Sequence, residues 1–150
     1  MKKLYYSLLL AAFIQPALAE ASLSPEALNI AREQVVVRYL QDLAKADAAD
    51  IATLFTEEGI VMSTSRGKAR AKEFFLAFLP QVTTASTELH QTFSGKTDAN
   101  RYAARFHLDY RLKDGETGNG EYMDEFVFEA NSTQLNAIYM FENLKFTGKG

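Results

Sequence analysis

The sequence predicts one α+β domain in which helices pack on a curved, mostly antiparallel β-sheet. Apolar residues recur at helical spacing before Pro80, and the spacing changes to a period of two after it. A core is available without disulfide bonds, because the chain has no cysteine but is 47% apolar, with eleven Phe and seven Tyr. Helices followed by a run of long strands are typical of the α+β class.

The first helix is predicted to begin at Ser24-Pro25-Glu26. This tripeptide combines a hydroxyl N-cap, a proline at the first helical position and an acid in the first turn. Apolar residues then recur at helical spacing from Leu28 to Leu43. We therefore expect a helix of about five turns.

Two shorter helices are expected before Pro80. Asp47 is predicted to cap the second helix, whose apolar residues are Ile51, Leu54 and Phe55. A Glu-Glu-Gly run at residues 57–59 breaks this helix, and residues 60–62 are expected to form a brief strand. The third helix is expected from Ala69 to about Leu79. The three helices would thus lie in the N-terminal part of the domain.

Four strands are expected after Pro80, at residues 87–93, 102–112, 122–130 and 134 to about 146. In the second of these, apolar and charged residues alternate. The apolar set on one face is Ala104, Phe106, Leu108 and Tyr110, and the polar set on the other is Arg105, His107, Asp109 and Arg111. A glycine-rich loop at 114–120 and a turn at 131–133 separate the last three strands. A sheet of such strands can curve around the helices to form a cone with one mouth.

Residues 1–19 have the pattern of a cleavable signal peptide. Lys2 and Lys3 form a positive start, residues 4–14 are mostly apolar, and Ala17-Leu18-Ala19 offers small residues at a cleavage site. An apolar stretch of about 11 residues is too short to span a bilayer, which needs about 20. We expect residues 20–150 to be released as one domain in the periplasm or the medium of a bacterium, with no membrane contact after cleavage.

Charge and composition exclude several kinds of partner. The formal net charge of −3 becomes −5 when Lys2 and Lys3, the only charged residues of 1–19, are removed. An acidic domain without a basic stripe argues against nucleic acid and anionic membranes. With no cysteine and only two distant histidines, no metal-binding spacing is present. No phosphate-binding or dinucleotide motif occurs, so no cofactor is expected.

Five segments together resemble the nuclear transport factor 2-like superfamily, which includes SnoaL-like and ketosteroid-isomerase-like proteins. They are residues 36–40, 46–55, 57–61, Gly67 and 123–128. The resemblance extends from about residue 26 to 146 and implies a cone of three helices on a curved sheet. The superfamily contains isomerases, cyclases, dehydratases, and immunity and transport proteins, so the resemblance does not decide the function.

The resemblance to ketosteroid isomerases implies a pair of hydrogen-bond donors. In those enzymes a tyrosine of the first helix and a protonated aspartate late in the sheet donate to the substrate carbonyl as it becomes an enolate. Tyr39 and Asp124 fall at these positions. The carboxylate base of that family falls at or next to Ser63, and a serine has no useful basicity near neutral pH. This departure argues against steroid isomerase activity.

Each candidate also has a purely structural interpretation. Tyr39 lies on a helix face with Val35 and Leu43, where it could pack in the core with its hydroxyl satisfied. Asp124 alternates with apolar residues, so burial would raise its pKa, but it could equally be paired with a buried hydroxyl or backbone group. His90 is a candidate for the missing base, whereas His107 is expected on the outer sheet face. Ser63 could offer a hydroxyl to a ligand or belong to a polar loop.

Three functions remain open at this point. The first is an exported protein that binds a small, partly apolar molecule, which Tyr39 and Asp124 would hydrogen-bond. The residues expected to line its pocket are Phe55, Val61, Ser63, Phe106, Leu108, Tyr110 and Phe126. The second is a cofactor-free isomerase, cyclase or lyase that uses Tyr39 and Asp124 as oxyanion donors, with His90 or a water for proton transfer. The third is an interaction module with a filled core; in each case we expect a homodimer through the outer sheet face.

Overall fold

Three α-helices and a six-stranded sheet make up residues 23–143, the part of the chain that the computed structural model describes. The helices are α1 (Pro25–Lys45), α2 (Ala48–Thr53) and α3 (Ala71–Phe78), and a short 3₁₀ turn follows at Leu79–Gln81. The strands are β1 (Phe55–Ser63), β2 (Gly67–Arg70), β3 (Val82–Ser94), β4 (Arg101–Leu112), β5 (Thr117–Phe128) and β6 (Leu135–Asn143). Their order in the sheet is β2-β1-β6-β5-β4-β3.

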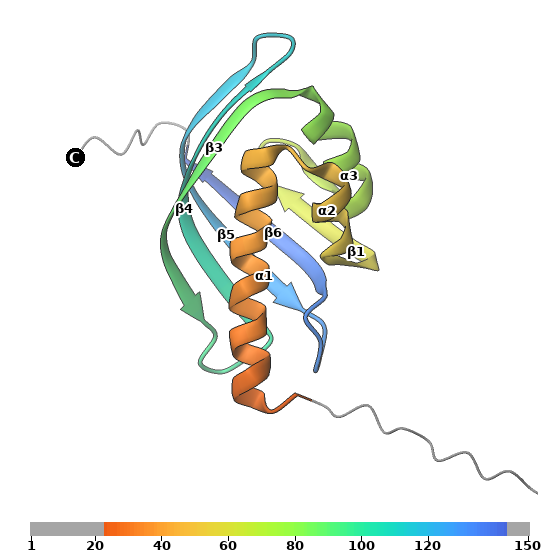
Figure 1. Cartoon of the computed structure of the whole chain (residues 1–150), viewed down its shortest axis with the longest axis vertical. Coiled ribbons are helices and arrows are strands. Elements are labelled where there is room, and N and C mark those ends of the chain that lie inside the picture. The colour runs from red at the N-terminus through yellow and green to blue at the C-terminus, as the bar shows by residue number, and fades with distance from the viewer. Residues whose placement is uncertain (1–22, 144–150) are drawn as a thin grey trace, which may run out of the picture.

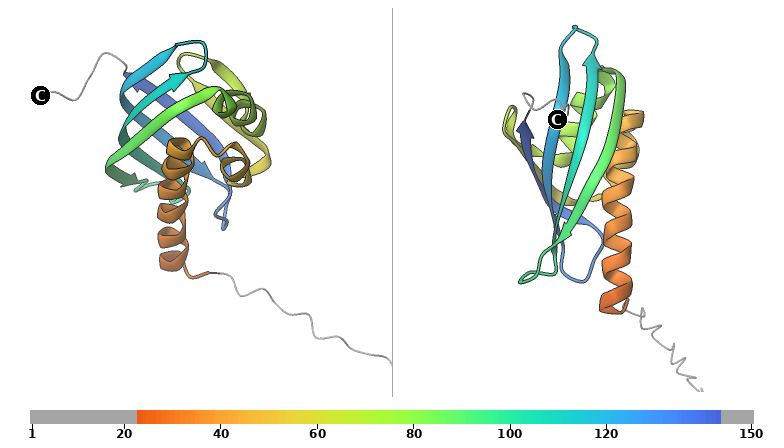
Figure 2. Two further views of the ribbon diagram at one scale, coloured as in Figure 1. Left: turned by 45° about the horizontal axis from the view of Figure 1, so that its top comes forward. Right: turned by 90° about the vertical axis from the view of Figure 1, so that its left-hand side faces the viewer.

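The sheet curves around the helices, so that one face is concave and covered. Figure 1 shows α1 running across this face, with α2 and α3 beside it over the β1 end. In the side view of Figure 2, α1 lies along one side of the strands, and no helix of residues 23–143 covers the opposite face. Since β1 pairs in parallel with β6 and the other neighbours pair antiparallel, the sheet is mixed but mostly antiparallel, as predicted.

Helix α1 begins and ends where its sequence signals predict. The Ser24 hydroxyl accepts a hydrogen bond from the Ala27 backbone N–H at 3.2 Å, and Pro25 opens the helix. The helix ends at Ala46, whose φ of 53° is left-handed and whose N–H bonds the carbonyls of the last turn. The buried apolar face comprises Val36, Tyr39, Leu40 and Leu43.

The second predicted helix is too long at its C-terminal end. Phe55 does not belong to it: α2 stops at Thr53, and Phe55 begins β1, opposite Leu135 of β6. The Glu-Glu-Gly run does not break a helix but lies within β1, where the register shifts between Phe55 and Ile60. A Cβ on Gly59 would lie 3.0 Å from Phe55 Cβ, so glycine permits this close approach. Pairing with a strand 80 residues away thus outweighs the local helical pattern.

The expected placement of three N-terminal helices is also wrong. Residues 67–70 form β2, which pairs antiparallel with β1 from Ile60↔Arg70 to Ser63↔Gly67, so α3 begins only at Ala71. Two strands therefore separate α3 from the first two helices. Gly67, with φ of +75°, supplies the left-handed conformation at the turn between these strands.

The remaining strands follow the predicted order, and two of them begin five residues earlier than expected. β3 begins at Val82, and β5 begins at Thr117, which shortens the loop after β4. Burial alternates along β4 as predicted, with Ala104, Phe106, Leu108 and Tyr110 buried. β6 is described to Asn143; the rest of the predicted strand, like residues 1–22, lies outside the described residues.

One buried arginine joins α1 to the turns at the end of the sheet. Arg32 is 1% exposed and donates four hydrogen bonds, to the carbonyls of Ala99, Glu129 and Ser132 and to the Asn100 side chain. Its guanidinium carbon also lies 5.1 Å from the centre of the Phe128 ring. The N-terminal half of α1 is therefore held to both the β3–β4 and β5–β6 turns.

Candidate functional site

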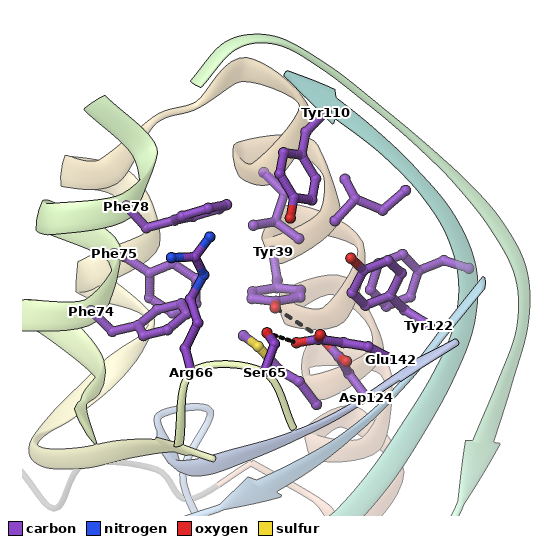
Figure 3. A pocket seen from close by; sticks show the side chains of 14 residues that line it. Tyr39, Ser65, Arg66, Phe74, Phe75, Phe78, Tyr110, Tyr122, Asp124 and Glu142 are labelled. Atoms are coloured by element: carbon purple, nitrogen blue, oxygen red, sulfur yellow. Dashed lines mark hydrogen bonds between the residues drawn. The ribbon is translucent and has the colours of Figure 1, made fainter. Parts of the chain in front are cut away.

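A pocket lies between α1, α3 and the concave face of the sheet (Figure 3). It is lined by Tyr39, Leu43, Ser65, Arg66, Phe74, Phe75, Phe78, Phe106, Leu108, Tyr110, Tyr122, Asp124, Met140 and Glu142. Most of these side chains are aromatic or aliphatic, and the polar groups among them are few. The cavity measures about 40 Å³. That is room for about three water molecules or a ligand of a few heavy atoms.

Tyr39 and Asp124 meet at the inner wall of this pocket. Tyr39 comes from the buried face of α1, where its ring makes edge contacts with Phe75 and Phe126 at centroid distances of 6.0 and 5.2 Å. Asp124 lies on the inward side of β5, opposite Met140 of β6. The Tyr39 hydroxyl donates to Asp124 Oδ2 at 2.9 Å, and both residues are 1% exposed. Figure 3 shows this bond and the two side chains beside Glu142.

The surroundings of Asp124 favour its neutral form. Burial is the largest effect and raises its pKa to about 8; the hydrogen bond from Tyr39 opposes the shift, and the charge of Glu142 adds to it. A neutral aspartic acid is a hydrogen-bond donor. Its Oδ1 is buried and has no hydrogen-bond partner among residues 23–143. Burial likewise raises the pKa of Tyr39 well above 10, so its hydroxyl stays protonated.

This geometry differs from the expectation that Tyr39 and Asp124 both bond the ligand directly. The tyrosine donates to the aspartic acid, and the aspartic acid presents its second oxygen to the pocket. The two groups are therefore connected in series, and Asp124 Oδ1 is the atom left without a partner among residues 23–143. Hydrogen bonds connected in this way strengthen one another in a low-dielectric site.

A second carboxyl group enters the pocket from β6. Glu142 lies opposite Tyr122 of β5 and two residues beyond Met140, on the same inward face. Its Oε1 accepts hydrogen bonds from Ser63 Oγ at 2.7 Å and Ser65 Oγ at 3.0 Å. The end of β1 and the turn that follows it thus supply one serine hydroxyl each at this place, and the neighbouring strand β6 supplies the carboxylate.

Arg66 lies at the mouth of the pocket. It bonds Glu116 at 2.7 Å, and its guanidinium carbon lies 5.1 Å from the centre of the Phe78 ring. The Tyr110 hydroxyl is 3.4 Å from the same Glu116 oxygen. Gly118 makes room for this ring, because a Cβ there would lie 2.2 Å from Tyr110 Cε1. The partly exposed side chains of Arg66 and Glu116 therefore cover this end of the pocket, next to the buried ring of Tyr110.

The structure places the predicted site residues in three different surroundings. Tyr39, Asp124, Phe106, Leu108 and Tyr110 line the pocket. Phe55, Val61 and Phe126 are at most 1% exposed and belong to the core behind the pocket wall, since Phe126 packs on Tyr39 and Phe55 on Phe75. Ser63 does not line the cavity either; it holds Glu142 in place.

The expectation that His90 serves the pocket does not hold. Its Nε2 lies 3.3 Å from Glu121 Oε1, and His107 Nδ1 lies 3.1 Å from the same oxygen. Glu121 pairs with His107 across β5 and β4, and both alternate with inward-facing residues. The three side chains therefore lie on the outer face of the sheet. His90 follows Leu89, which pairs with the inward-facing Phe106, so alternation along β3 places His90 on the outer face, at the bulge between Leu89 and Gln91.

The sequence-based prediction missed much of the pocket. The missed residues are Leu43, Ser65, Arg66, Phe74, Phe75, Phe78, Tyr122, Met140 and Glu142. One signal was present for Glu142. Along the last strand Ile138 and Met140 point inward, and Glu142 occupies the next inward position, where an apolar residue would be expected. An acid at an apolar register position marks a site, but only if the facing of that strand is known.

Structural comparisons find similar folds at low sequence identity. An epoxide hydrolase/cyclase-like enzyme of pyran ring formation in salinomycin, SalBIII, has a TM-score of 0.63 and 15% identity, covering 76% of this chain and 92% of its own. A protein with a ketosteroid isomerase-like fold from Catenulispora acidiphila, in complex with trimethylamine, has a TM-score of 0.62 and 7% sequence identity. The match covers 76% of this chain and 88% of that protein. A candidate SnoaL-like polyketide cyclase from Jannaschia has a TM-score of 0.61 and 11% sequence identity. The match covers 77% of this chain and 88% of that protein. No protein-family model matches the sequence, and a comparison with curated protein sequences returns no match.

Proposed function

From the nuclear transport factor 2-like fold of this chain, we propose that it binds a small, partly apolar molecule bearing a carbonyl or hydroxyl group. The single observation behind the proposal is Asp124 Oδ1, which is buried at the pocket wall with no hydrogen-bond partner in residues 23–143. Leaving such a group unpaired costs about 1–3 kcal/mol. A ligand oxygen placed at Oδ1 removes this cost, and the surrounding aromatic rings cover the rest of the molecule.

The size of the cavity limits the ligand. About 40 Å³ admits a molecule of a few heavy atoms. A larger ligand requires the mouth to open, which displacement of the partly exposed Arg66 side chain permits. The space beside Tyr39 and Asp124 also favours a binder over an interaction module with a filled core.

Proteins of the same fold support a small-molecule ligand. The similar structures include an epoxide hydrolase/cyclase-like enzyme, a candidate polyketide cyclase and a protein in complex with trimethylamine. These proteins are at most 15% identical to this chain, so they support the use of the cone as a pocket and leave the ligand open.

The proposal is tested by titrating the protein with acetone, butanone, cyclopentanone and the corresponding alcohols, followed by NMR chemical shifts. We expect shifts at residues of the pocket, and weaker binding in Asp124→Asn and Tyr39→Phe. Two matched variants serve as controls. Asp42→Asn changes another buried aspartate outside the pocket, and Tyr102→Phe changes another buried tyrosine. Equal affinities in all four variants, or no binding by the wild-type protein, would contradict the proposal.

We also propose that residues 1–19 direct export and are removed, which releases the domain into the periplasm or medium. The proposal is based on the sequence pattern alone, because these residues lie outside the described part. In residues 23–143 there is no helix with the length and apolar character needed to cross a membrane. The intact mass of the exported protein should correspond to a start at Glu20. Ala19→Arg should block processing while Leu18→Ala does not; a mature protein that retains Met1 would contradict the proposal.

A homodimer through the outer sheet face is a further part of this proposal. Met62, Phe93 and Phe141 are 38%, 41% and 52% exposed, and strand registers place all three on this uncovered face. A two-fold interface would bury the same patch on both copies. Light scattering should show a dimer that Phe141→Glu dissociates. Leu76→Glu is the matched control, because Leu76 is 54% exposed on α3; a monomeric wild-type protein would refute the dimer.

A further inference from the structure

We propose that the outward face of α1 binds the α1 helix of a second copy of this chain, as a parallel two-stranded coiled coil. This pairing does not depend on the proposed ligand or on the sheet-face dimer, because it uses the side of the molecule that is opposite the outer sheet face. It gives a partner to a helix face that the fold leaves uncovered.

The two faces of α1 have different surroundings. The inner face lies in the core and carries the buried side chains of Arg32 and Tyr39. On the outward face, Ile30 and Val37 are large and apolar but 53% and 40% exposed. Figure 2 shows this side of α1 free of the other elements of residues 23–143. Exposed apolar residues that line up on one helix face indicate an interaction surface.

The residues of the outward face recur at the spacing of a coiled-coil seam. Intervals of three and four residues alternate along it, at heptad positions a and d. The members of the seam are Ala27, Ile30, Gln34, Val37, Gln41 and Ala44. In the same heptad, Arg32 and Tyr39 fall at position f, which lies opposite the seam. The 21 residues of α1 therefore carry a seam on one side and the core contacts on the other.

A shallow groove on this face has the form that a coiled-coil partner needs. Each side chain of a seam inserts into a hole formed by four residues of the facing helix. The groove consists of two overlapping holes of this kind, formed by Ile30, Glu33, Gln34 and Val37 and by Gln34, Val37, Arg38 and Gln41. In a parallel, in-register pair, the first hole receives Gln34 of the second copy and the other hole receives its Val37.

The charges beside the seam favour the parallel orientation. Glu33 lies at position g and Arg38 at position e of the following heptad, and a parallel pair places these positions next to each other. An antiparallel pair would place g next to g and e next to e, which brings like charges together. Asp50 of α2 holds Arg38 through Nε and Nη2, and Nη1 takes part in no hydrogen bond within residues 23–143. This nitrogen can bind Glu33 of the second copy.

Gln34 and Gln41 make the pair specific but weak. In a parallel pair each of these side chains meets its own counterpart, and an amide can both donate and accept a hydrogen bond. A polar residue at position a fixes the register and the number of strands, at a cost in stability. We therefore expect a weak contact, which cross-linking detects at concentrations where light scattering shows only the sheet-face dimer.

The chain has no cysteine, so a single introduced thiol reports on the pair. In the parallel pair Val37 lies beside Val37 of the second copy. We expect Val37→Cys, with oxidised glutathione as the oxidant, to form a covalent dimer on the order of tenfold faster than a thiol outside the seam, because the pair raises the effective thiol concentration. Leu76→Cys is the matched control, since Leu76 is 54% exposed on α3. Non-reducing electrophoresis measures both rates.

A second substitution tests the seam itself. Ile30→Glu, added to Val37→Cys, should slow cross-linking to the control rate, because it places two like charges in the pair. Asn29→Glu adds the same charge beside the seam, at position c, and should leave the rate unchanged. All four positions are exposed, so these variants retain the core.

Each remaining outcome decides the matter. Cross-linking of Val37→Cys at the rate of Leu76→Cys overturns the inference, and so does a rate that Ile30→Glu does not lower. Cross-linking that occurs only when Val37→Cys is mixed with Gln34→Cys shows an antiparallel pair and overturns the parallel arrangement. Phe141→Glu changes the outer sheet face and should leave the cross-linking rate unchanged; a fall to the control rate would show that the thiols meet through that face instead.

Discussion

The protonation of Asp124 is the residue property on which the pocket most depends. A carboxyl buried between aromatic rings has one hydrogen bond, from Tyr39, and a second carboxyl nearby in Glu142. Because its pKa is raised to about 8, it is a donor at neutral pH. Asp124 would therefore offer a neutral carboxylic acid to a carbonyl group placed in this pocket, whereas an aspartate with an ordinary pKa would offer a charged carboxylate.

The same property links the stability of the fold to pH. The pKa of Asp124 is raised from 3.8 to about 8 in the folded state, so the folded protein keeps a proton that the unfolded chain loses above pH 3.8. Its contribution to the free energy of unfolding is therefore complete below pH 3.8 and is lost as the pH rises toward 8. Tyr39 and Glu142 are the titratable groups that influence it most strongly.

We predict that Asp124→Asn removes this pH dependence. From pH 6 to about 7.5, the wild-type free energy of unfolding should fall relative to that of the variant by about 1.4 kcal/mol per pH unit. Burial also raises the pKa of Asp42, but only to about 6, so its contribution is lost mostly below this interval. Urea unfolding at several pH values measures the difference. Parallel curves for both proteins would show that Asp124 is ionised in the fold.

A double-mutant cycle should show the coupling of Tyr39 to Asp124. Tyr39→Phe leaves Asp124 Oδ2 without its donor, so we expect a loss of about 1–3 kcal/mol in the free energy of unfolding. In the Asp124→Leu background the same tyrosine change should cost less, because the acceptor is already absent. Additive losses in the four proteins would argue against a coupled pair.

At the scale of elements, Arg32 connects α1 to two turns that are far apart in the sequence. Its four hydrogen bonds reach residues 99 and 100 on one side and 129 and 132 on the other. This side chain therefore helps to set the angle at which α1 crosses the sheet. That angle brings Tyr39, two turns further along α1, to Asp124.

We predict that Arg32→Ala destabilises the domain by at least about 2 kcal/mol, because buried carbonyl groups lose their donors. Arg32→Lys should recover only part of this loss, since a single ammonium cannot reach four acceptors arranged around a guanidinium. Arg38→Ala is the control: Arg38 lies on the exposed side of α1 and pairs with Asp50 of α2, and its loss should have a much smaller effect. Chemical denaturation of the three variants measures these differences, and equal losses in Arg32→Ala and Arg38→Ala would contradict the role of Arg32.

At the scale of the whole molecule, the pocket is formed where all layers meet. Its walls come from α1, α3, the β1–β2 turn and three central strands. A ligand that binds there contacts every layer, so binding should stabilise the domain as one unit. The outer sheet face, with Glu121 and its two histidines, is separate from this site.

Ligand binding should therefore raise the free energy of unfolding of the whole domain. At a ligand concentration 100 times the Kd, the expected gain is about 2.7 kcal/mol. Asp124→Asn should show a smaller gain at the same ligand concentration, whereas Asp42→Asn should match the wild-type protein. Thermal unfolding with and without the ligand measures this, and a wild-type midpoint that does not move at saturation would contradict binding to the folded state.

Local sequence signals were sufficient for part of this architecture. The caps and apolar spacing of α1 and the alternation of β4 could be found from the chain alone, whereas Tyr39 and Asp124 were identified through the resemblance to ketosteroid isomerases. In each case the signal lies within one element, since a cap involves neighbouring residues and a periodicity reveals the buried face of a helix or strand. The class of fold follows from such signals, whereas the pair at the inner wall of the pocket was implied by the resemblance.

The remaining features depend on contacts between residues far apart in the chain. Phe55 lies in a strand because β6 pairs with it, and His90 lies away from the pocket because the register of β3 against β4 places it on the outer face, near Glu121. Glu142 reaches the pocket because the register of β6 against β5 sets it inward, beside the Ser63 hydroxyl of β1. Strand register is set by partners 20 or 80 residues away, so only the tertiary structure could decide that the pocket contains two carboxyl groups.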